Sequence, residues 1–444
     1  MVNLIEMAIP FFFVLIFLEI FVGYLIKRRV YRYADSINDL SMGIIDQVGG
    51  IFLKSIIGGG YVYIYSNHAL FDISASSVWA AIACLLGYDL MYYWAHRCSH
   101  DINIMWGSHI PHHQSEEYNL TVALRQGVFQ GCFFWLFYLP LAFVGFPPAL
   151  FITMASIDTL YQFWIHTRTI GKLGPLEWFL NTPSHHRVHH AKNPKYIDKN
   201  HGGILIIWDK MFGTFAAEEE EPIYGTATPL RSWNPVWADI HYWVDLWRLA
   251  VKAPRWQDRL LIWFKKPAWR PQGLEKQGPP AYLTKQFYEK YNPRIPAGLS
   301  LYTLLQFVPA LVIGTVFLGY ETDMIWQTRA GVAGLVIMTL VCIGGILEAK
   351  RWALGLEIAR QPVMSVAAFI FASLTFGLDS PAGVIAAAAG TIYSMGMLVW
   401  LLQYRAVFTR PFGPVAYAPD TIAPVEDERM PDFPLEQDAA PAAK

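Results

Sequence analysis

The stretch Val78–His113, VWAAIACLLGYDLMYYWAHRCSHDINIMWGSHIPHH, determines the fold that we predict for this chain. From Val78 to Trp94 it is apolar except for Asp89, which is the composition of a helix that crosses a bilayer. Histidines follow immediately, at spacings that align side chains on one face of a helix. A membrane helix that leads directly into a cluster of metal-ligating side chains is therefore the pattern from which the rest of the sequence is interpreted.

Apolar stretches of similar length recur on both sides of this one. Over the whole chain 54% of the residues are hydrophobic and 16% are charged, whereas a typical globular domain has about 25% charged residues. We therefore predict an all-α, polytopic integral membrane helical bundle with about eight or nine spans. One stretch, 126–165, is broken by Gly145 and the prolines that follow it, so it is counted as two helices. The predicted spans lie within Ala8–Ile26, Ile44–Tyr65, Val78–Trp94, Gln126–Ile165, Leu299–Gly319, Ala330–Leu347, Pro362–Phe376 and Ala382–Leu402.

Composition also divides the chain into segments with different roles. We expect N-terminal transmembrane anchor helices in residues 1–76 and a histidine-rich catalytic domain in residues 77–232. Residues 233–297 are rich in Trp and Arg, and residues 298–409 hold the C-terminal transmembrane helices. Residues 410–444 are rich in Pro, Ala and acidic side chains, which predicts a disordered tail.

The distribution of charge predicts that the histidines face the cytoplasm. Lys and Arg collect in the loops after alternate spans, for example from Lys27 to Arg32, at Arg97 and at Lys350, and cytoplasmic loops carry such an excess. Arg329 is the one cation that this scheme places on the opposite side. With Lys+Arg at 34 and Asp+Glu at 35, the net charge is -1, so the basic excess that nucleic-acid binding requires is missing.

Tryptophan and basic residues alternate between Trp233 and Trp269. Trp prefers the headgroup layer of a membrane, and neighbouring Lys or Arg side chains reach lipid phosphates, so one interpretation is one or two helices lying in the membrane surface. The other is a set of ordinary soluble helices packed on the cytoplasmic cap. We expect the first, so that residues 233–297 form an amphipathic interfacial segment.

The histidines form repeated motifs with ligand spacing. One H-x-x-x-H motif and two H-x-x-H-H motifs are formed by His96 and His100, by His109, His112 and His113, and by His186, His189 and His190. A single zinc ion takes three or four protein ligands, so this many imidazoles predict two metal ions with room for exogenous ligands. Imidazole suits iron, copper and zinc alike. Our hypothesis is iron, because a redox-active ion that activates O2 for attack on a lipid C–H bond suits a membrane position.

Acidic residues near these motifs are candidates for supporting roles, because a ligating histidine usually donates its second ring proton to a carboxylate or a carbonyl. Asp89 precedes His96 by two helical turns inside an apolar span, where an ionisable group is costly unless it is used. Asp158 precedes His166 in a comparable way and is the weaker case.

These motifs resemble those of the fatty acid hydroxylase / sterol desaturase superfamily of membrane di-iron enzymes. Within it, the stretches His96–Gln126, Leu160–Thr167 (LYQFWIHT) and Leu173–Phe215 are similar to the alkylglycerol monooxygenase family. The resemblance implies that the motif histidines are the metal ligands and that His166 is a further one. His201 stands where that family usually has Tyr. It is either a substituted ligand or a tolerated change, and we favour the tolerated change.

The resemblance also implies a chemistry. It implies two iron ions, with zinc as an alternative occupant, O2, and electrons from tetrahydrobiopterin or another donor such as a reductase. Asp101, where the family also keeps an acid, is then a candidate to anchor the reductant, and its other interpretation is a surface residue at a helix end. The implied reaction cleaves the O-alkyl ether bond of an alkylglycerol to a fatty aldehyde and a glycerol derivative.

Alternative functions remain at this point. A fatty acid or sterol hydroxylase or desaturase of the same superfamily would share the metal core. A metal-binding transporter or sensor is more remote, because its histidines would line the interior of the spans. The expected location is the bacterial inner membrane or the endoplasmic reticulum membrane, depending on the host.

Overall fold

The computed structural model describes residues 4–274 and 290–409, and it confirms the predicted all-α fold. Within these residues the only β-type pairings are two isolated bridges, Leu180 with Leu205 and Ala191 with Tyr224. The predicted disordered tail, 410–444, lies outside the described residues, as does 275–289 within the Trp- and Arg-rich segment.

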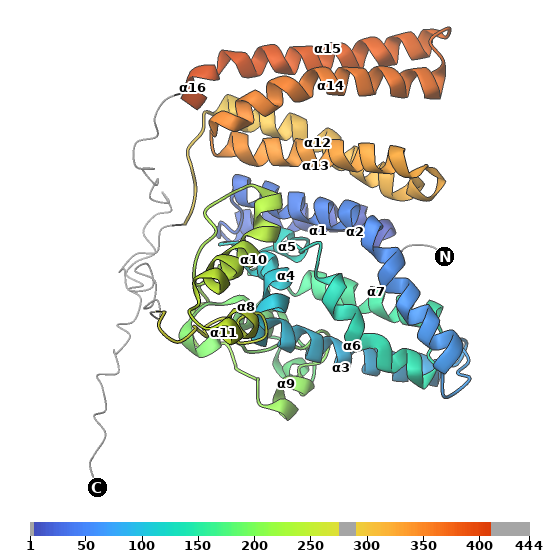
Figure 1. Ribbon diagram of the computed structural model, residues 1–444, viewed down its shortest axis with the longest axis vertical. Helices are drawn as coiled ribbons and strands as arrows, with labels where there is room; N and C mark the ends of the chain where they lie inside the picture. Colours follow the sequence, from blue (N-terminus) through green and yellow to red (C-terminus); the bar gives the residue numbers. More distant parts are fainter. Residues whose placement is uncertain (1–3, 275–289, 410–444) are drawn as a thin grey trace.

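The long helices are stacked in layers (Figure 1). α14 and α15 form the outermost layer and pack on α12 and α13, which in turn contact α2. On the other side of α2 lie α6, α3 and α7, and α1 contacts both α7 and α12. The helices of these layers are α1 (Leu4–Leu25), α2 (Tyr33–His68), α3 (Val78–Asp101), α6 (Gly131–Val144), α7 (Pro148–Trp164), α12 (Ala297–Tyr320), α13 (Trp326–Leu347), α14 (Arg351–Phe376) and α15 (Pro381–Gln403).

Shorter helices gather at one end of these layers, on the left in Figure 1. They are α4 (Asn103–His113), α5 (Leu120–Ala123), α8 (Pro183–His190), α9 (Ile207–Phe212), α10 (Pro235–Lys252) and α11 (Trp256–Leu261), with 3₁₀ turns at Gly174–Trp178 and Pro194–Tyr196. In the Trp-rich segment, α10 packs one face on α4, while Trp247 and Trp256 are exposed. Beyond α12, a 3₁₀ turn, Glu321–Asp323, leads into α13, and α16 (Arg405–Thr409) follows α15.

Fewer helices than predicted are long and apolar enough to cross a bilayer alone. In the described residues there are six, or seven if α2, whose two halves meet at 47°, counts as one span. The predicted pair within Gln126–Ile165 accounts for the difference. α6 has 14 residues and α7 has 17, so they are only about 21 and about 26 Å long against a hydrocarbon core of roughly 30 Å.

The turn between α6 and α7 forms where it was predicted. Gly145 ends α6 in the left-handed conformation, with φ +110°. A Cβ atom at this position would lie 2.0 Å from the carbonyl oxygen of Phe71. Glycine is therefore required here both by the backbone angle and by the close approach of the α2–α3 connection.

The C-terminal helices extend further than their hydropathy suggested. α14 begins at Arg351, whereas the predicted span began at Pro362, which lies inside the helix. The first three turns carry the charged residues Glu357 and Arg360. In the structure these two residues are buried and paired, with Arg360 Nε 2.7 Å from Glu357 Oε2.

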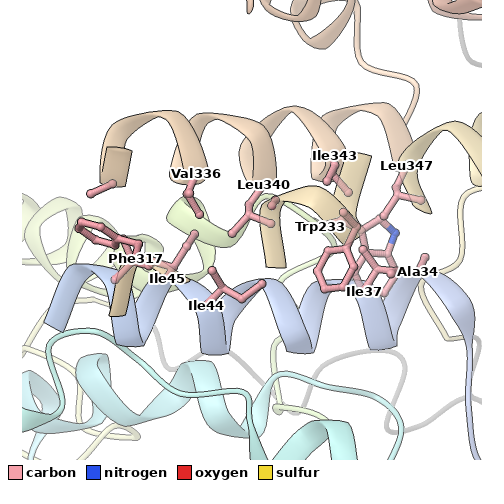
Figure 2. Close-up of a cluster of buried hydrophobic side chains, with 14 of the residues drawn as sticks. Ala34, Ile37, Ile44, Ile45, Trp233, Phe317, Val336, Leu340, Ile343 and Leu347 are labelled. Carbon is pink, nitrogen blue, oxygen red and sulfur yellow. The ribbon is translucent and has the colours of Figure 1, made fainter. Parts of the chain in front are cut away.

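An apolar core joins the C-terminal helices to the N-terminal half (Figure 2). Ile44 and Ile45 of α2 lie against Phe317 of α12, and Val336 and Leu340 of α13 pack over them. This contact fixes α12 beside α2, which places a C-terminal helix next to the region that holds the histidines.

Candidate metal centre

The nine histidines predicted as metal ligands converge where α3, α4 and α8 meet the end of α7. His96 and His100 occupy the last turns of α3, and His166 follows α7 directly. The two H-x-x-H-H motifs form the last turns of α4 and α8. All nine side chains are buried.

The histidines form two groups, in each of which the candidate ligand atoms lie within 4.8 Å of one another. The motifs do not correspond to the groups. Adjacent helical residues point about 100° apart, so His112 and His113 face different groups, as do His189 and His190. The first group is His96, His100, His109, His113 and His189; the second is His112, His166, His186 and His190.

Hydrogen bonds fix the tautomer of five of these rings. In each of them Nδ1 lies close to an oxygen that can only accept, so Nδ1 carries the proton and Nε2 keeps its lone pair. The pairs are His96 with the carbonyl of His201 (2.8 Å), His109 with Gln130 Oε1 (2.7 Å), His112 with the carbonyl of Arg125 (2.8 Å), His166 with the carbonyl of Gln162 (2.7 Å) and His189 with the carbonyl of Lys199 (2.9 Å).

The Nε2 atoms of each group converge. In the first group, Nε2 of His109 is 3.0 Å from that of His96 and 3.1 Å from that of His113. In the second group, Nε2 of His166 is 3.0 Å from that of His186 and 3.3 Å from that of His112. Two nitrogens that ligate one ion at about 2.1 Å and at right angles lie about 3.0 Å apart. These separations therefore fit a cation at the centre of each group, which would remove the repulsion between the lone pairs.

Protonation is disfavoured throughout the site. Burial lowers the pKa of His109 and that of His166 to about 4. Burial, followed by repulsion from the neighbouring imidazoles, lowers the pKa values of the other candidate ligands on α4 and α8 well below their usual value. Because metal ligation requires the neutral ring, the rings are held in the form that binds metal.

The two groups differ in how many coordination positions they would leave open on a bound ion. In the first group, the centre of the His100 ring lies 4.8 to 5.4 Å from the centres of the other four rings, so this group has five imidazoles close together. Five imidazoles leave one position on a six-coordinate ion, and four imidazoles leave two. Both groups can therefore hold an ion that still accepts a small exogenous ligand.

Asp89 lies near the first group, but its carboxylate makes no hydrogen bond to the ring nitrogens of that group. Its carboxylate accepts hydrogen bonds from the backbone N–H groups of Ile204 (2.7 Å) and Leu205 (3.1 Å) and from Trp208 Nε1 (2.8 Å). This segment follows His201, whose carbonyl holds His96. Asp89 thus stabilises the loop that orients a candidate ligand.

The other predicted acids lie at different depths. Asp158 is buried beside Asp89, and its Oδ2 accepts a hydrogen bond from Gln162 Nε2 (2.5 Å). Asp101, at the end of α3, is partly exposed and pairs with Lys266 (2.7 Å). Asp101 is therefore available to a molecule that approaches from solvent, whereas Asp158 is not.

His201 and His185 belong to neither group. His201 is fully buried with its ring 5.1 Å from that of His100, and it lies outside the set of convergent nitrogens. His185 directs Nδ1 to the carbonyl of Leu180 (3.3 Å), away from its neighbour in the second group.

Sequence reasoning missed the side chains that hold the rings and helices in place. Gln130 positions His109, as described above. Arg125 is fully buried, and besides presenting its carbonyl to His112 it donates to Asn38 Oδ1 (2.5 Å) and Gln114 Oε1 (2.6 Å). An arginine at the border of the apolar stretch 126–165 was the available signal, whereas Gln130 gave none.

Glu19 connects the first helix to this site. It is buried on α1 and accepts hydrogen bonds from the backbone N–H of Leu120 (2.9 Å) and from the hydroxyls of Tyr31 and Thr167. Thr167 follows His166 in the chain. The carboxylate therefore fastens α1 to the segment that carries a candidate ligand.

A cavity of about 350 Å³ leads from the histidines between the long helices. His109, His112 and His166 line it, so it reaches both groups. Residues of α1, α2, α7 and α12, together with Tyr92 of α3 and residues in the segment 123–131, complete the wall. Most of those on α1, α2 and α12 are apolar. An elongated apolar molecule with a polar end is the kind of ligand that this lining fits.

Fold and site define an integral membrane protein of the fatty acid hydroxylase class, and the profile of that family, fatty acid hydroxylase, matches residues 81–214. The chain is 37% identical over 358 residues to an alkylglycerol monooxygenase of Xenopus tropicalis and 38% identical over 374 residues to one of Homo sapiens. It is 37% identical over 361 residues to one of Danio rerio, and each match covers 80% of both chains. No solved structure matches the chain.

The chain belongs to the alkylglycerol monooxygenase family, and it is accordingly an oxidoreductase. The resemblance inferred from the histidine motifs is confirmed.

Proposed function

We propose that this protein cleaves the O-alkyl ether bond of alkylglycerols. The observation that carries this proposal is the cavity between the helices. Its largely apolar wall leads to His109 of the first histidine group and to His112 and His166 of the second. A lipid fits such a passage with its hydrocarbon chain along the apolar wall and its ether carbon beside the histidines. The names of the relatives supply the substrate class.

The reaction consumes O2, two electrons and two protons. One oxygen atom is inserted into the C–H bond of the chain carbon that bears the ether oxygen, and the other leaves as water. The resulting hemiacetal breaks its C–O bond to the glycerol, which gives a fatty aldehyde and a free glycerol hydroxyl. Two iron ions, when bound, supply the activation of O2.

The nine histidines of the two groups are the proposed ligands of these ions. Gln130 and the carbonyls of Arg125 and Gln162 keep Nδ1 protonated and the rings oriented, which is the usual work of groups behind metal ligands. We assign Asp89 as a positioning residue, because it supports the loop after His201 and does not reach the cavity wall.

Tetrahydrobiopterin, or another two-electron donor, is the proposed reductant. Asp101 is its proposed contact, because this carboxylate is close to the histidine-bearing end of α3 and reachable from solvent. The histidine-bearing end of the helices is proposed to face the cytoplasm, because basic residues cluster in the loops on that side. The host membrane would be the bacterial inner membrane or the endoplasmic reticulum membrane.

The experiment is an assay of the protein purified into lipid nanodiscs and loaded with ferrous iron. Alkylglycerol, O2 and tetrahydrobiopterin are supplied, and fatty aldehyde is measured. An acylglycerol of the same chain length is the matched control, because it has an ester in place of the ether. Aldehyde from the ether lipid alone supports the proposal. Hydroxylation of a free fatty acid or a sterol without aldehyde release would overturn it in favour of another activity of the superfamily.

A further inference from the structure

One wall of the cavity comes from outside the region that matches fatty acid hydroxylase. That match ends at residue 214, whereas α12, which begins at Ala297, contributes Leu311, Gly314, Thr315 and Leu318 to the lining. Residues three and four apart lie on one face of a helix. We call these four residues the α12 stripe. It runs about 10 Å along the helix axis.

The α12 stripe faces α2 where the two helices approach closely. A Cβ atom on Gly314 would lie 3.3 Å from Ile44 Cγ2 and 3.9 Å from Val48 Cγ2, and both of these side chains also line the cavity. Phe317, on the adjacent face of α12, fills the contact with α2 (Figure 2). The missing side chain of Gly314 therefore keeps space open beside a tightly packed contact.

The cavity also reaches the outer surface at this stripe. Thr315 lines the cavity and is exposed, and its hydroxyl donates to the carbonyl of Leu311 in its own helix (2.9 Å). α1, which contacts α12, contributes Ile9 and Phe12 to the lining of the same cavity. α12 and α1 are both long and apolar enough to cross a membrane. A hydrocarbon chain can therefore reach the histidines from the bilayer between these two helices.

We infer that α12 selects the alkyl chain of the lipid substrate. The chain lies along the α12 stripe while its first carbon lies at the histidine end of the cavity, so the bulk of the stripe determines which chain lengths are accepted. The identity of the lipid in this inference rests on the proposed function. In a hydrophobic pocket, one methylene more or less changes kcat/KM by about 10- to 200-fold, so a change in the stripe should be measurable.

The first test compares Thr315→Phe with Val316→Phe. Thr315 is exposed and its hydroxyl bonds only within its own helix, so the larger ring needs no repacking and narrows the passage. Val316 is 54% exposed and does not line the cavity. We expect Thr315→Phe to lower kcat/KM for long-chain alkylglycerols at least about tenfold more than for short-chain ones. Val316→Phe should leave that ratio as it is in the wild type.

Metal content and melting temperature show that each variant is folded, and Gly314→Ala adds a milder change to the same stripe. Gly319→Ala is its matched control, because a Cβ atom there meets nothing within 4 Å. An unchanged chain-length preference in folded Thr315→Phe overturns the inference.

A second test does not depend on turnover. An alkylglycerol with a photoreactive diazirine at the end of its chain is bound to the wild-type protein without O2, and the labelled peptides are identified after irradiation. We expect label between Leu311 and Leu318. Label confined to helices other than α12 overturns the inference. Label on α12 in a protein that releases no aldehyde would instead contradict the proposed function, and the inference would then hold for another lipid.

Discussion

The C-terminal helices and the histidine site both bury polar groups, but they satisfy them differently. In the C-terminal bundle, Glu357 accepts hydrogen bonds from Arg360, Tyr302 (2.5 Å) and Gln361 (2.7 Å), and Arg360 also donates to Thr339 (3.0 Å). Both charged groups are fully paired within the protein. In the histidine site, Nε2 of His100, His189 and His190 has no partner. Buried charges that pair with each other indicate a structural role, whereas several convergent groups without partners indicate a ligand.

The largest effect should come from removing a ligand in the second histidine group. His112→Ala leaves that group with three imidazoles and removes a lining residue of the cavity. We expect turnover to fall by more than about 100-fold, beyond the loss for a group that only supports a ligand, and bound iron to fall with it. Iron analysis and aldehyde assays measure both. His185→Ala is the control, and retained turnover in His112→Ala would contradict the metal assignment.

A large effect on stability is expected from breaking the buried pair of Glu357 and Arg360. Glu357→Ala leaves Arg360 buried without its counter-charge, which should lower the free energy of unfolding by about 3–5 kcal/mol. Thermal unfolding measures this, and iron content per folded molecule should not change. The double variant Glu357→Leu/Arg360→Leu removes both charges and should recover most of the stability. Iron loss in folded Glu357→Ala would show that the two regions are not independent.

An intermediate effect should follow from removing a group that orients a ring. Gln130→Leu takes away the acceptor of His109 Nδ1, and the expected cost is about 10- to 100-fold in metal affinity or turnover. Gln130→Glu keeps an acceptor at the same position and should restore most of the loss. If Gln130→Leu and Gln130→Glu bind iron equally well, the hydrogen bond does not position the ligand.

The smallest effect on stability is expected at the exposed end of α3. Asp101→Asn removes the ion pair with Lys266, whose side chain is 67% exposed, so the free energy of unfolding should change by less than about 1 kcal/mol. Iron content should be unaffected. A raised KM for tetrahydrobiopterin at unchanged kcat would support the proposed contact with the reductant, and an unchanged KM would remove it.

The fold and eight of the nine candidate ligands were accessible from the sequence, because apolar length and histidine spacing are local signals. His166, a single histidine, came only from the family resemblance. The division of adjacent histidines between the two groups depends on how α4 and α8 are placed against each other, which no local pattern encodes. The start of α14 was placed at Pro362 and not at Arg351 for a related reason: the burial and mutual pairing of Glu357 and Arg360 are not visible in hydropathy.

The hydrogen bonds of Glu19 have a consequence for biogenesis. Its partners Leu120 and Thr167 lie 101 and 148 residues further along the chain, so the ribosome has yet to make them when α1 enters the insertion machinery. Tyr31, 12 residues after Glu19, is the nearest of its donors in the chain, and a carboxylate in the bilayer that lacks the other two is costly. The nascent first helix therefore gains its full anchorage only after Thr167 has been synthesised, which couples membrane integration at the N-terminus to completion of the site.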